Sequence, residues 1–248
     1  MAKKRSRTNK KQRQLSQQKQ QQFMLIGGGA VVAVALFIGV ILFMQNDADV
    51  EACAATDEEC YGTYLAVEER GLTDEQIPYI GPEDAPIIIA EFSNFECVHC
   101  KTYHDTVNRI IEQHVQNGEA QFQYLPLSNT SGSRVAARAA VCAAEQDAFW
   151  QFHSELFEFQ GTGSFNTDSV QDIADEMGLD IDALEDCMNS NVPDRALNQA
   201  RTLSSRLGVT GTPTVAYSLD NGQTWQVLER RDLGTVSALI AQANAQEG

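Results

Sequence analysis

The chain has 248 residues, of which 43% are hydrophobic, enough for one large domain or two small ones. Its net charge of −16 is unevenly distributed, because residues 1–22 hold eight of the 18 Lys and Arg and no acid. The rest of the chain therefore sets 10 basic residues against 34 acidic ones. Since nucleic-acid binding needs a basic face that replaces phosphate counterions, this acidic body argues against any nucleic-acid partner.

The N-terminal segment predicts where the chain is located. Residues 1–22 are basic, rich in glutamine and without apolar periodicity, which predicts a disordered tail. Residues 23–44 carry no charge, and as a helix they would extend roughly 33 Å, against a hydrocarbon core of ~30 Å. The basic flank favours the cytoplasmic side. We therefore expect a signal-anchor: a cytoplasmic tail, one transmembrane helix in the lipid bilayer of the cell membrane, and an extracytoplasmic body.

Two alternatives to an uncleaved anchor exist. A cleaved signal peptide would have a shorter apolar region followed by small residues, whereas Asn46 and Asp47 follow this one. A lipoprotein processing site is suggested faintly by residues 50–53, but Glu51 fits it badly. Both therefore rank below the anchor.

The first part of the body predicts a strand–helix–strand unit. Residues 45–75 are acidic and poorly periodic, which indicates a stalk. Residues 87–92 are apolar and β-branched, as in a buried strand, and a short loop follows. A helix is expected from residue 97 to about 116, and a second strand at 120–127.

The middle of the chain is helical and the end returns to strands. Asn221-Gly222 predicts a hairpin turn between strands at 214–218 and 225–228. Helices are expected at residues 133–146, 149–157, 167–177, 181–188, 194–207 and 233–245. This order predicts an α/β domain over residues 76–248, with a thioredoxin-like sheet and a helical insertion at about 129–207.

Six cysteines in an exported chain favour disulfides. Cys97 and Cys100 form a Cys-x-x-Cys pair, and Cys53 and Cys60 are near neighbours, which leaves Cys142 to pair with Cys187. We expect the last two pairs to be structural. Cys53–Cys60 as a second redox pair is the alternative, although its acidic surroundings disfavour a thiolate.

The predicted position of Cys97 suggests redox chemistry. It lies where a strand ends and a helix begins, so unpaired N–H groups and the helix dipole would favour its thiolate. His99 offers a further charge or hydrogen bond, and Cys100, one turn later, is close enough to close a disulfide. A stabilised Cys97 thiolate favours the reduced form and makes the disulfide oxidising.

Three stretches of this sequence carry a specific family resemblance. They are Gly81-Pro82-Glu83-Asp84-Ala85-Pro86, Phe92-Ser93-Asn94-Phe95-Glu96-Cys97-Val98-His99-Cys100, and Gly208-Val209-Thr210-Gly211-Thr212-Pro213-Thr214. Together they resemble the DsbA-type family of exported thiol–disulfide oxidoreductases, in particular its membrane-anchored branch, over roughly residues 76–247. Many relatives have proline after the first cysteine where this chain has Val98, so the resemblance does not set the redox potential.

The resemblance implies further roles. Pro213 is expected to be cis and to face the redox pair, with Thr212 pairing to the substrate backbone. Glu91, an acid on the buried strand, is expected to have a raised pKa and to help move protons; the alternative is an acid paired elsewhere or reaching solvent. The resemblance also implies that reduced exported polypeptides are the substrates, that a quinone-linked membrane oxidase is the partner, and that no cofactor is needed.

Other functions fit these residues less well. A structural metal site usually needs a second ligand pair, which the sequence does not offer, so we expect no metal. His99 is alternatively a solvated residue, His104 is expected to be an exposed helix residue, and His114 and His153 have no evident partner. A disulfide isomerase or reductase of the same fold is the main alternative. A non-catalytic peptide-binding chaperone and a metal-delivery protein are less favoured, because the Cys-x-x-Cys is intact and few other ligands lie near it.

The topology is testable on intact cells. Protease added outside, after removal of any wall, should digest residues 46–248 and spare the tail, because the basic flank keeps the tail inside. Antibodies to each end would follow the fragments. A body that stays fully protected until the membrane is permeabilised would contradict the predicted orientation.

Overall fold

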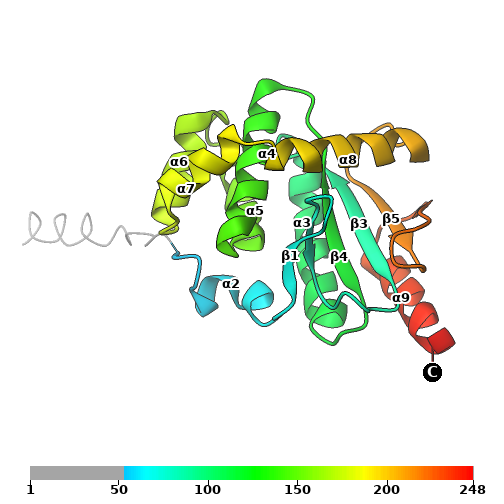
Figure 1. Ribbon diagram of the computed structural model, residues 1–248. Coiled ribbons are helices and arrows are strands. Elements are labelled where there is room, and N and C mark those ends of the chain that lie inside the picture. The colour runs from blue at the N-terminus through cyan, green and yellow to red at the C-terminus, as the bar shows by residue number, and fades with distance from the viewer. Residues whose placement is uncertain (1–52, 248) are drawn as a thin grey trace, which may run out of the picture. The chain divides into compact units, whose positions relative to one another are not determined.

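The computed structural model describes residues 53–247, which fold around a six-stranded sheet of order β1-β2-β4-β3-β5-β6 (Figure 1). β3 and β4 are parallel, and the other neighbours are antiparallel. The strands are β1 (Arg70–Leu72), β2 (Pro78–Ile80), β3 (Ile88–Ser93), β4 (Gln121–Pro126), β5 (Thr214–Ser218) and β6 (Gln226–Val227). The four predicted strands are therefore present, each within two residues of its expected ends.

The helices divide between the two faces of this sheet. They are α2 (Glu58–Leu65), α3 (Val98–Ile110), α4 (Ser131–Ala143), α5 (Phe149–Phe159), α6 (Thr167–Glu176), α7 (Ile181–Asn189), α8 (Val192–Leu207) and α9 (Leu233–Glu247), with a 3-10 turn η2 (Ala144–Gln146). α3 connects the parallel strands, and a π-helical turn η1 (Ile111–Val115) extends it. None of the helices in residues 53–247 has the length and apolar character to cross a bilayer, and the predicted tail and span, residues 1–44, lie outside the described part.

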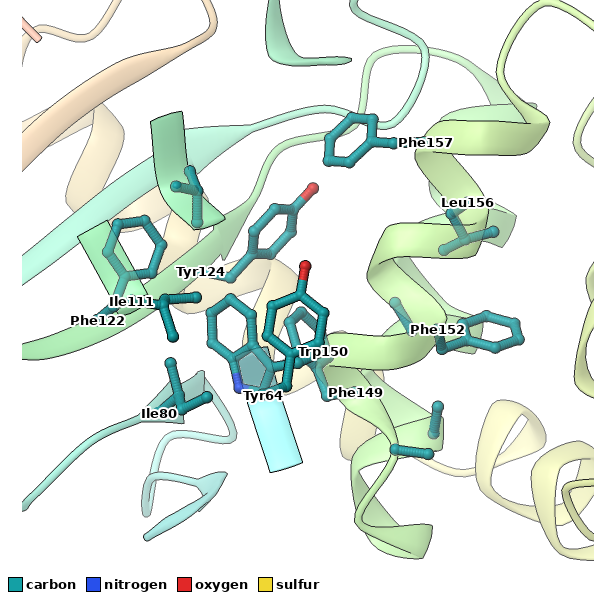
Figure 2. Packing of buried hydrophobic residues seen from close by; sticks show 14 of the residues in the cluster. Tyr64, Ile80, Ile111, Phe122, Tyr124, Phe149, Trp150, Phe152, Leu156 and Phe157 are labelled. Atoms are coloured by element: carbon teal, nitrogen blue, oxygen red, sulfur yellow. The ribbon is translucent and has the colours of Figure 1, made fainter. Parts of the chain in front are cut away.

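The side chains of β3 explain both cores. Ile89 and Glu91 point to the face covered by α3, α5 and α9, whereas Ala90 and Phe92 point to the face covered by α8, as the alternation of a strand requires. Aromatic side chains dominate the first core, where Trp150 packs edge-on against Phe122 (Figure 2). Glu91 is thus the acid that β3 carries into an apolar layer.

Residues 58–75, which the sequence predicts to be part of a stalk at 45–75, belong to the folded domain. Tyr61 and Tyr64, three residues apart on α2, are both buried, and the ring of Tyr64 lies 6.2 Å from that of Trp150 (Figure 2). The Trp150 indole N–H donates to the carbonyl of Tyr79 on β2 (3.1 Å). The sequence did not reveal that α2 is amphipathic, because acidic residues occupy the exposed side of this short helix.

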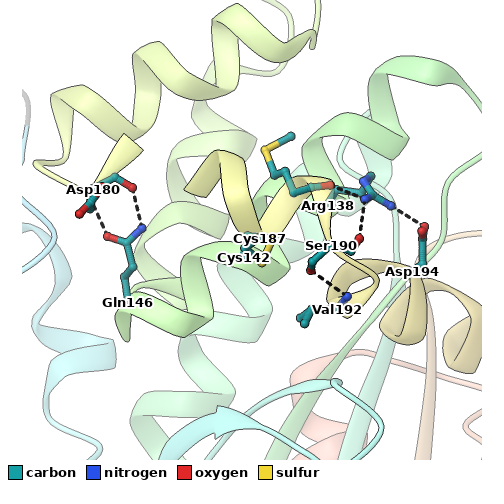
Figure 3. Close-up of a disulfide and its surroundings, with 9 residues drawn as sticks. Arg138, Cys142, Gln146, Asp180, Cys187, Ser190, Val192 and Asp194 are labelled. Carbon is teal, nitrogen blue, oxygen red and sulfur yellow. Dashed lines mark hydrogen bonds and ion pairs between the residues drawn. A yellow bond between two sulfur atoms is a disulfide. The ribbon is translucent and has the colours of Figure 1, made fainter. Parts of the chain in front are cut away.

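Two disulfides brace the domain. Cys142 on α4 is bonded to Cys187 on α7 with a Cα–Cα distance of 5.6 Å, and Cys53 is bonded to Cys60 with 6.3 Å (Figure 3 shows the former). Next to the first, Arg138 on α4 hydrogen-bonds the carbonyl of Met188, at the end of α7. The helical block of α4 to α7 is therefore held by a covalent bond and by polar contacts.

The longer disulfide loop should matter more to stability. Replacing Cys142 and Cys187 together by alanine should lower the free energy of unfolding by about 4 kcal/mol, and replacing Cys53 and Cys60 by about 2.5 kcal/mol, because the unfolded chain gains more freedom when the longer loop opens. Urea denaturation of the full-length variants measures both losses. Equal losses, or a larger loss for Cys53 and Cys60, would contradict the chain-entropy explanation.

Candidate functional site

The turn between β3 and α3 sets the position of Cys97. The side-chain oxygen of Asn94 accepts a hydrogen bond from the N–H of Glu96 (2.8 Å), and the N–H of Cys97 donates to the carbonyl of Asn94 (2.9 Å). Cys97 then caps α3 with extended backbone (φ −86°, ψ 113°), and its side chain makes no capping bond. The thiol therefore lies at the positive end of the helix dipole.

The loop before β5 lies against this thiol. The peptide bond between Thr212 and Pro213 is cis, and the Sγ of Cys97 donates to the carbonyl oxygen of Thr212 (3.3 Å). The hydroxyl of Thr214 donates to the carbonyl of Gly211 (2.7 Å), which tightens the loop. Four sequence-predicted residues, Cys97, Cys100, Thr212 and Pro213, are thus brought to one place.

The two thiols have different surroundings. Cys97 is half-buried and Cys100 is buried, and both are free. Burial by itself would raise the pKa of the Cys97 thiol, but hydrogen bonds from the side-chain hydroxyl of Thr212 and from the backbone N–H groups of Cys100 and His99 outweigh it, so this pKa is lowered. Burial, and then the charge of Glu91, raise the pKa of Cys100 to about 12. Cys97 is therefore the thiol that ionises first.

His99 helps to lower the pKa of Cys97 through its backbone N–H, and its side chain is exposed. The neighbouring Val98 is 65% exposed, so an apolar side chain stands beside the thiol. The sequence suggested a charge or hydrogen bond from the imidazole. In the structure the hydrogen-bonding group is the amide.

Glu91 lies beneath the cysteine pair in a largely apolar layer. It is 1% exposed, its Oε1 has no hydrogen-bond partner among the described residues, and burial raises its pKa to about 7, with Ser93 and the charge of Arg231 acting the other way. The hydroxyls of Ser93 and Tyr124 are likewise buried without a partner of ordinary geometry. Sequence analysis identified Glu91 but missed Ser93, although two residues along a strand place both on one face.

Two histidines, His104 and His114, differ from their predicted states. His104 was expected to be exposed but is buried against α5, where its Nε2 lies 3.2 Å from the hydroxyl of Ser154, and burial lowers its pKa to about 4. His153 is buried beside it with a pKa well below the ordinary value for the same reason, and neither ring nitrogen has a described partner. His114 pairs with Glu119 (2.7 Å). The spacing of apolar residues in α3 did not predict that His104 is buried, because this residue lies at the edge of the apolar face of the helix.

Potential metal ligands gather at one place in the described part of the chain. Cys53, Asp57 and Cys60 lie within reach of a common ion, but both sulfurs are consumed by their disulfide. Around Cys97 and Cys100, within residues 53–247, no third His, Cys or carboxylate completes such a group. The donor set of the site suits thiol chemistry better than metal binding.

Comparisons with known proteins agree with this geometry. Residues 73–223 match the family described as thioredoxin. The chain is 34% identical over 87 residues to disulfide bond formation protein D of Bacillus subtilis (34% of this chain, 39% of that one), and 30% identical over 106 residues to a probable disulfide bond formation protein D of Bacillus anthracis (41% and 46%). The matches thus span less than half of these relatives. The crystal structure of oxidised BdbD from Bacillus subtilis superposes with a TM-score of 0.59 at 21% identity, covering 71% of this chain and 97% of that one.

Burial of Glu91 should cost stability at neutral pH. Because its folded pKa is raised above the unfolded value, the folded protein retains this proton between about pH 4.5 and 7, so stability falls as pH rises through that window. Glu91→Gln should therefore leave unfolding unchanged near pH 4 and stabilise the reduced protein by about 3 kcal/mol at pH 8.

Urea denaturation of the reduced protein at the two pH values measures this difference, with the exposed Glu176→Gln as the control. A Glu91→Gln effect of equal size at both pH values would point to altered packing and contradict a raised pKa.

Proposed function

Because the chain belongs to the thioredoxin family, whose match covers more than half of its length, and places two unequal thiols beside Thr212, we propose that it is a thiol–disulfide oxidoreductase acting through Cys97 and Cys100. The resemblance to DsbA-type proteins is confirmed by this family match together with the relatives. The observation that carries the proposal is the asymmetry of the pair. Cys97 is accessible with a lowered pKa, and Cys100 is buried with a raised one.

Disulfide donation follows from this asymmetry. A substrate thiolate attacks the Sγ of Cys97 in the Cys97–Cys100 disulfide; the S–S bond breaks, and Cys100 leaves with the electron pair and takes a proton. The substrate's second thiol, after losing its proton, attacks the substrate sulfur of the mixed disulfide and releases Cys97 as a thiolate. Two substrate thiols are oxidised to a disulfide, and the enzyme pair gains two electrons.

Glu91 is suited to supply the proton that Cys100 takes. Its pKa of about 7 lets it hold a proton at neutral pH and lose it without a large free-energy cost. A charged Glu91 would repel a thiolate at Cys100, and this repulsion, together with burial, raises the pKa of that thiol. Cys100 thus leaves as a thiol, and Cys97 as the stabilised anion.

The direction of net transfer is oxidation. Whatever stabilises the Cys97 thiolate stabilises the reduced form, which makes the disulfide a stronger oxidant. The backbone amides at the start of α3 and Thr212 provide that stabilisation. The lowered pKa of Cys97 therefore favours an oxidase over an isomerase or a reductase.

The cellular setting belongs to the same proposal. The basic tail and the uncharged residues 23–44 support a single-pass anchor in the cell membrane with the body on the extracytoplasmic side. Cys142–Cys187 and Cys53–Cys60 support a compartment in which disulfides persist. Reduced exported polypeptides are the substrates in this setting, and a quinone-linked membrane oxidase returns the pair to the disulfide.

The roles of the two cysteines are separable by mutation. Cys97→Ser should abolish oxidation of a reduced test protein, because the attacked sulfur is gone. Cys100→Ser should instead accumulate mixed disulfides when its Cys97 thiolate attacks a disulfide of an oxidised test protein, because no neighbouring thiol resolves them. Non-reducing gels with peptide mapping detect these adducts.

Thiolate absorbance against pH in Cys100→Ser completes the test. Cys97 should titrate below about 8.5, the ordinary value of a free cysteine. His99→Ala should leave this titration nearly unchanged if only the backbone amide acts, whereas a rise would show that the imidazole also contributes. A Cys97 that titrates at about 8.5 would remove the oxidase assignment in favour of the reductase or isomerase.

A further inference from the structure

A pocket of about 300 Å³ opens beside the redox pair, between the loop that ends in Thr212 and helix α8. Thr212 belongs to its wall, and the carbonyl of the same residue contacts the Sγ of Cys97, so the pocket adjoins the reacting sulfur. The remaining wall is partly apolar and partly polar. Its residues are Asn94, Pro126, Leu127, Ser128, Asn129, Leu197, Arg201, Val209, Thr210 and Gly211.

Arg201 is the charged side chain of this wall. It follows Leu197 by one helical turn on α8, and that spacing places both residues on one face of the helix. Its side chain is exposed, and within residues 53–247 no carboxylate lies within ion-pair distance of it. Arg134 and Arg138, by contrast, both pair with Asp194 at the other end of α8.

Five of the nine arginines in residues 53–247 have no ion pair among these residues, and Arg201 is the one of the five that lines the pocket. Beyond residue 22 the chain holds 10 basic against 34 acidic residues, so carboxylates are plentiful, and yet none of those in residues 53–247 lies within ion-pair distance of Arg201. The guanidinium presents a rigid fork of donors that fits a carboxylate with two hydrogen bonds. Next to it, Leu197, Leu127 and Val209 offer the apolar surface that the stem of a glutamate or a neighbouring apolar side chain would contact.

We propose that the pocket beside Thr212 is a carboxylate subsite, in which Arg201 binds an aspartate or glutamate of the substrate polypeptide close to its reacting cysteine. This rests on the proposed function, since a substrate must form a mixed disulfide with Cys97 to bring that acid into reach. A substrate segment paired in extended form with Thr212 advances about 3.3 Å per residue, so the acid lies within about three residues of the cysteine.

The acidity of the body does not oppose such a preference at short range. Repulsion between the body and an acidic substrate acts over distances that salt screens, with a Debye length of about 8 Å at physiological ionic strength. A direct Arg201–carboxylate contact lies within that length. Arg201 therefore selects among substrates that have already arrived, by their local sequence and not by their net charge.

The experiment compares dithiol peptides that differ at one position. The peptides are made in sets of three, whose members carry Glu, Gln or Lys at the same position within three residues of the reacting cysteine. The rate of peptide oxidation by the full-length oxidised protein is measured for each. In wild type the Glu peptide should react about two- to fivefold faster than the Gln peptide at the best position, as for an exposed ion pair.

Variants assign this preference to Arg201. Arg201→Gln should remove it, Arg201→Glu should transfer it to the Lys peptide, and Arg201→Lys should retain part of it. Arg206→Gln removes an equal charge from the same helix outside the pocket and should leave the preference intact. Because the ratios are compared between proteins, an effect of Glu on the peptide thiol itself cancels.

The outcomes separate the subsite from the activity. If every peptide is oxidised but the Glu-to-Gln ratio is the same in wild type and in Arg201→Gln, the subsite is overturned and the oxidoreductase stands. If no peptide is oxidised, the proposed function fails and the subsite with it. The rate at which each variant oxidises the Gln peptide reports whether that variant has folded. If Arg201→Gln does not fold, Arg201→Lys provides the test.

Discussion

The contact between Cys97 and Thr212 joins two parts of the fold that are 115 residues apart in the chain. Cys97 takes part in this contact because β3 ends in a tight turn directly before α3. Thr212 takes part because α8 is capped by Gly208 and the loop that follows runs back to β5. β3 and β5 are neighbours in the sheet, which holds both loops at the same edge. The whole helical insertion lies between them in sequence and still leaves this contact intact, so the local turn places the thiol and the sheet brings the loop of Thr212 to it.

The region beneath the site departs from an ordinary core. Glu91, Ser93, Tyr124 and His153 are buried with polar atoms that lack partners among the described residues, and each such atom costs about 1–3 kcal/mol. Stacked aromatic rings and the disulfide between α4 and α7 offset this cost around them. The same burial separates the pKa values of the two thiols. The buried polar groups therefore lower the stability of the fold at the place where the chemistry requires two thiols of unequal pKa.

Sequence patterns predicted the sheet strands near the site and the position of Cys97, because strand alternation and the turn before a helix are local features. They did not predict α2, β1 and β2, which pack through distant contacts: Tyr64 on α2 meets Trp150, 86 residues along the chain, and the Trp150 indole donates to the carbonyl of Tyr79 on β2. His104 shows the same limit, since α5 covers it only in the folded chain. Arg201 carries no sequence motif at all, and its significance depends on which carboxylates lie nearby.

The two buried histidines have a consequence for acid surroundings. Neither His104 nor His153 takes up a proton readily while the chain is folded, because burial disfavours the charged ring, but both do so once it unfolds. Below about pH 6.5 proton uptake therefore pulls the equilibrium toward the unfolded chain, progressively down to the folded value of about 4 for His104. The two histidines between α3 and α5 thus set an acid limit on where this protein remains folded, independently of the redox state of its cysteines.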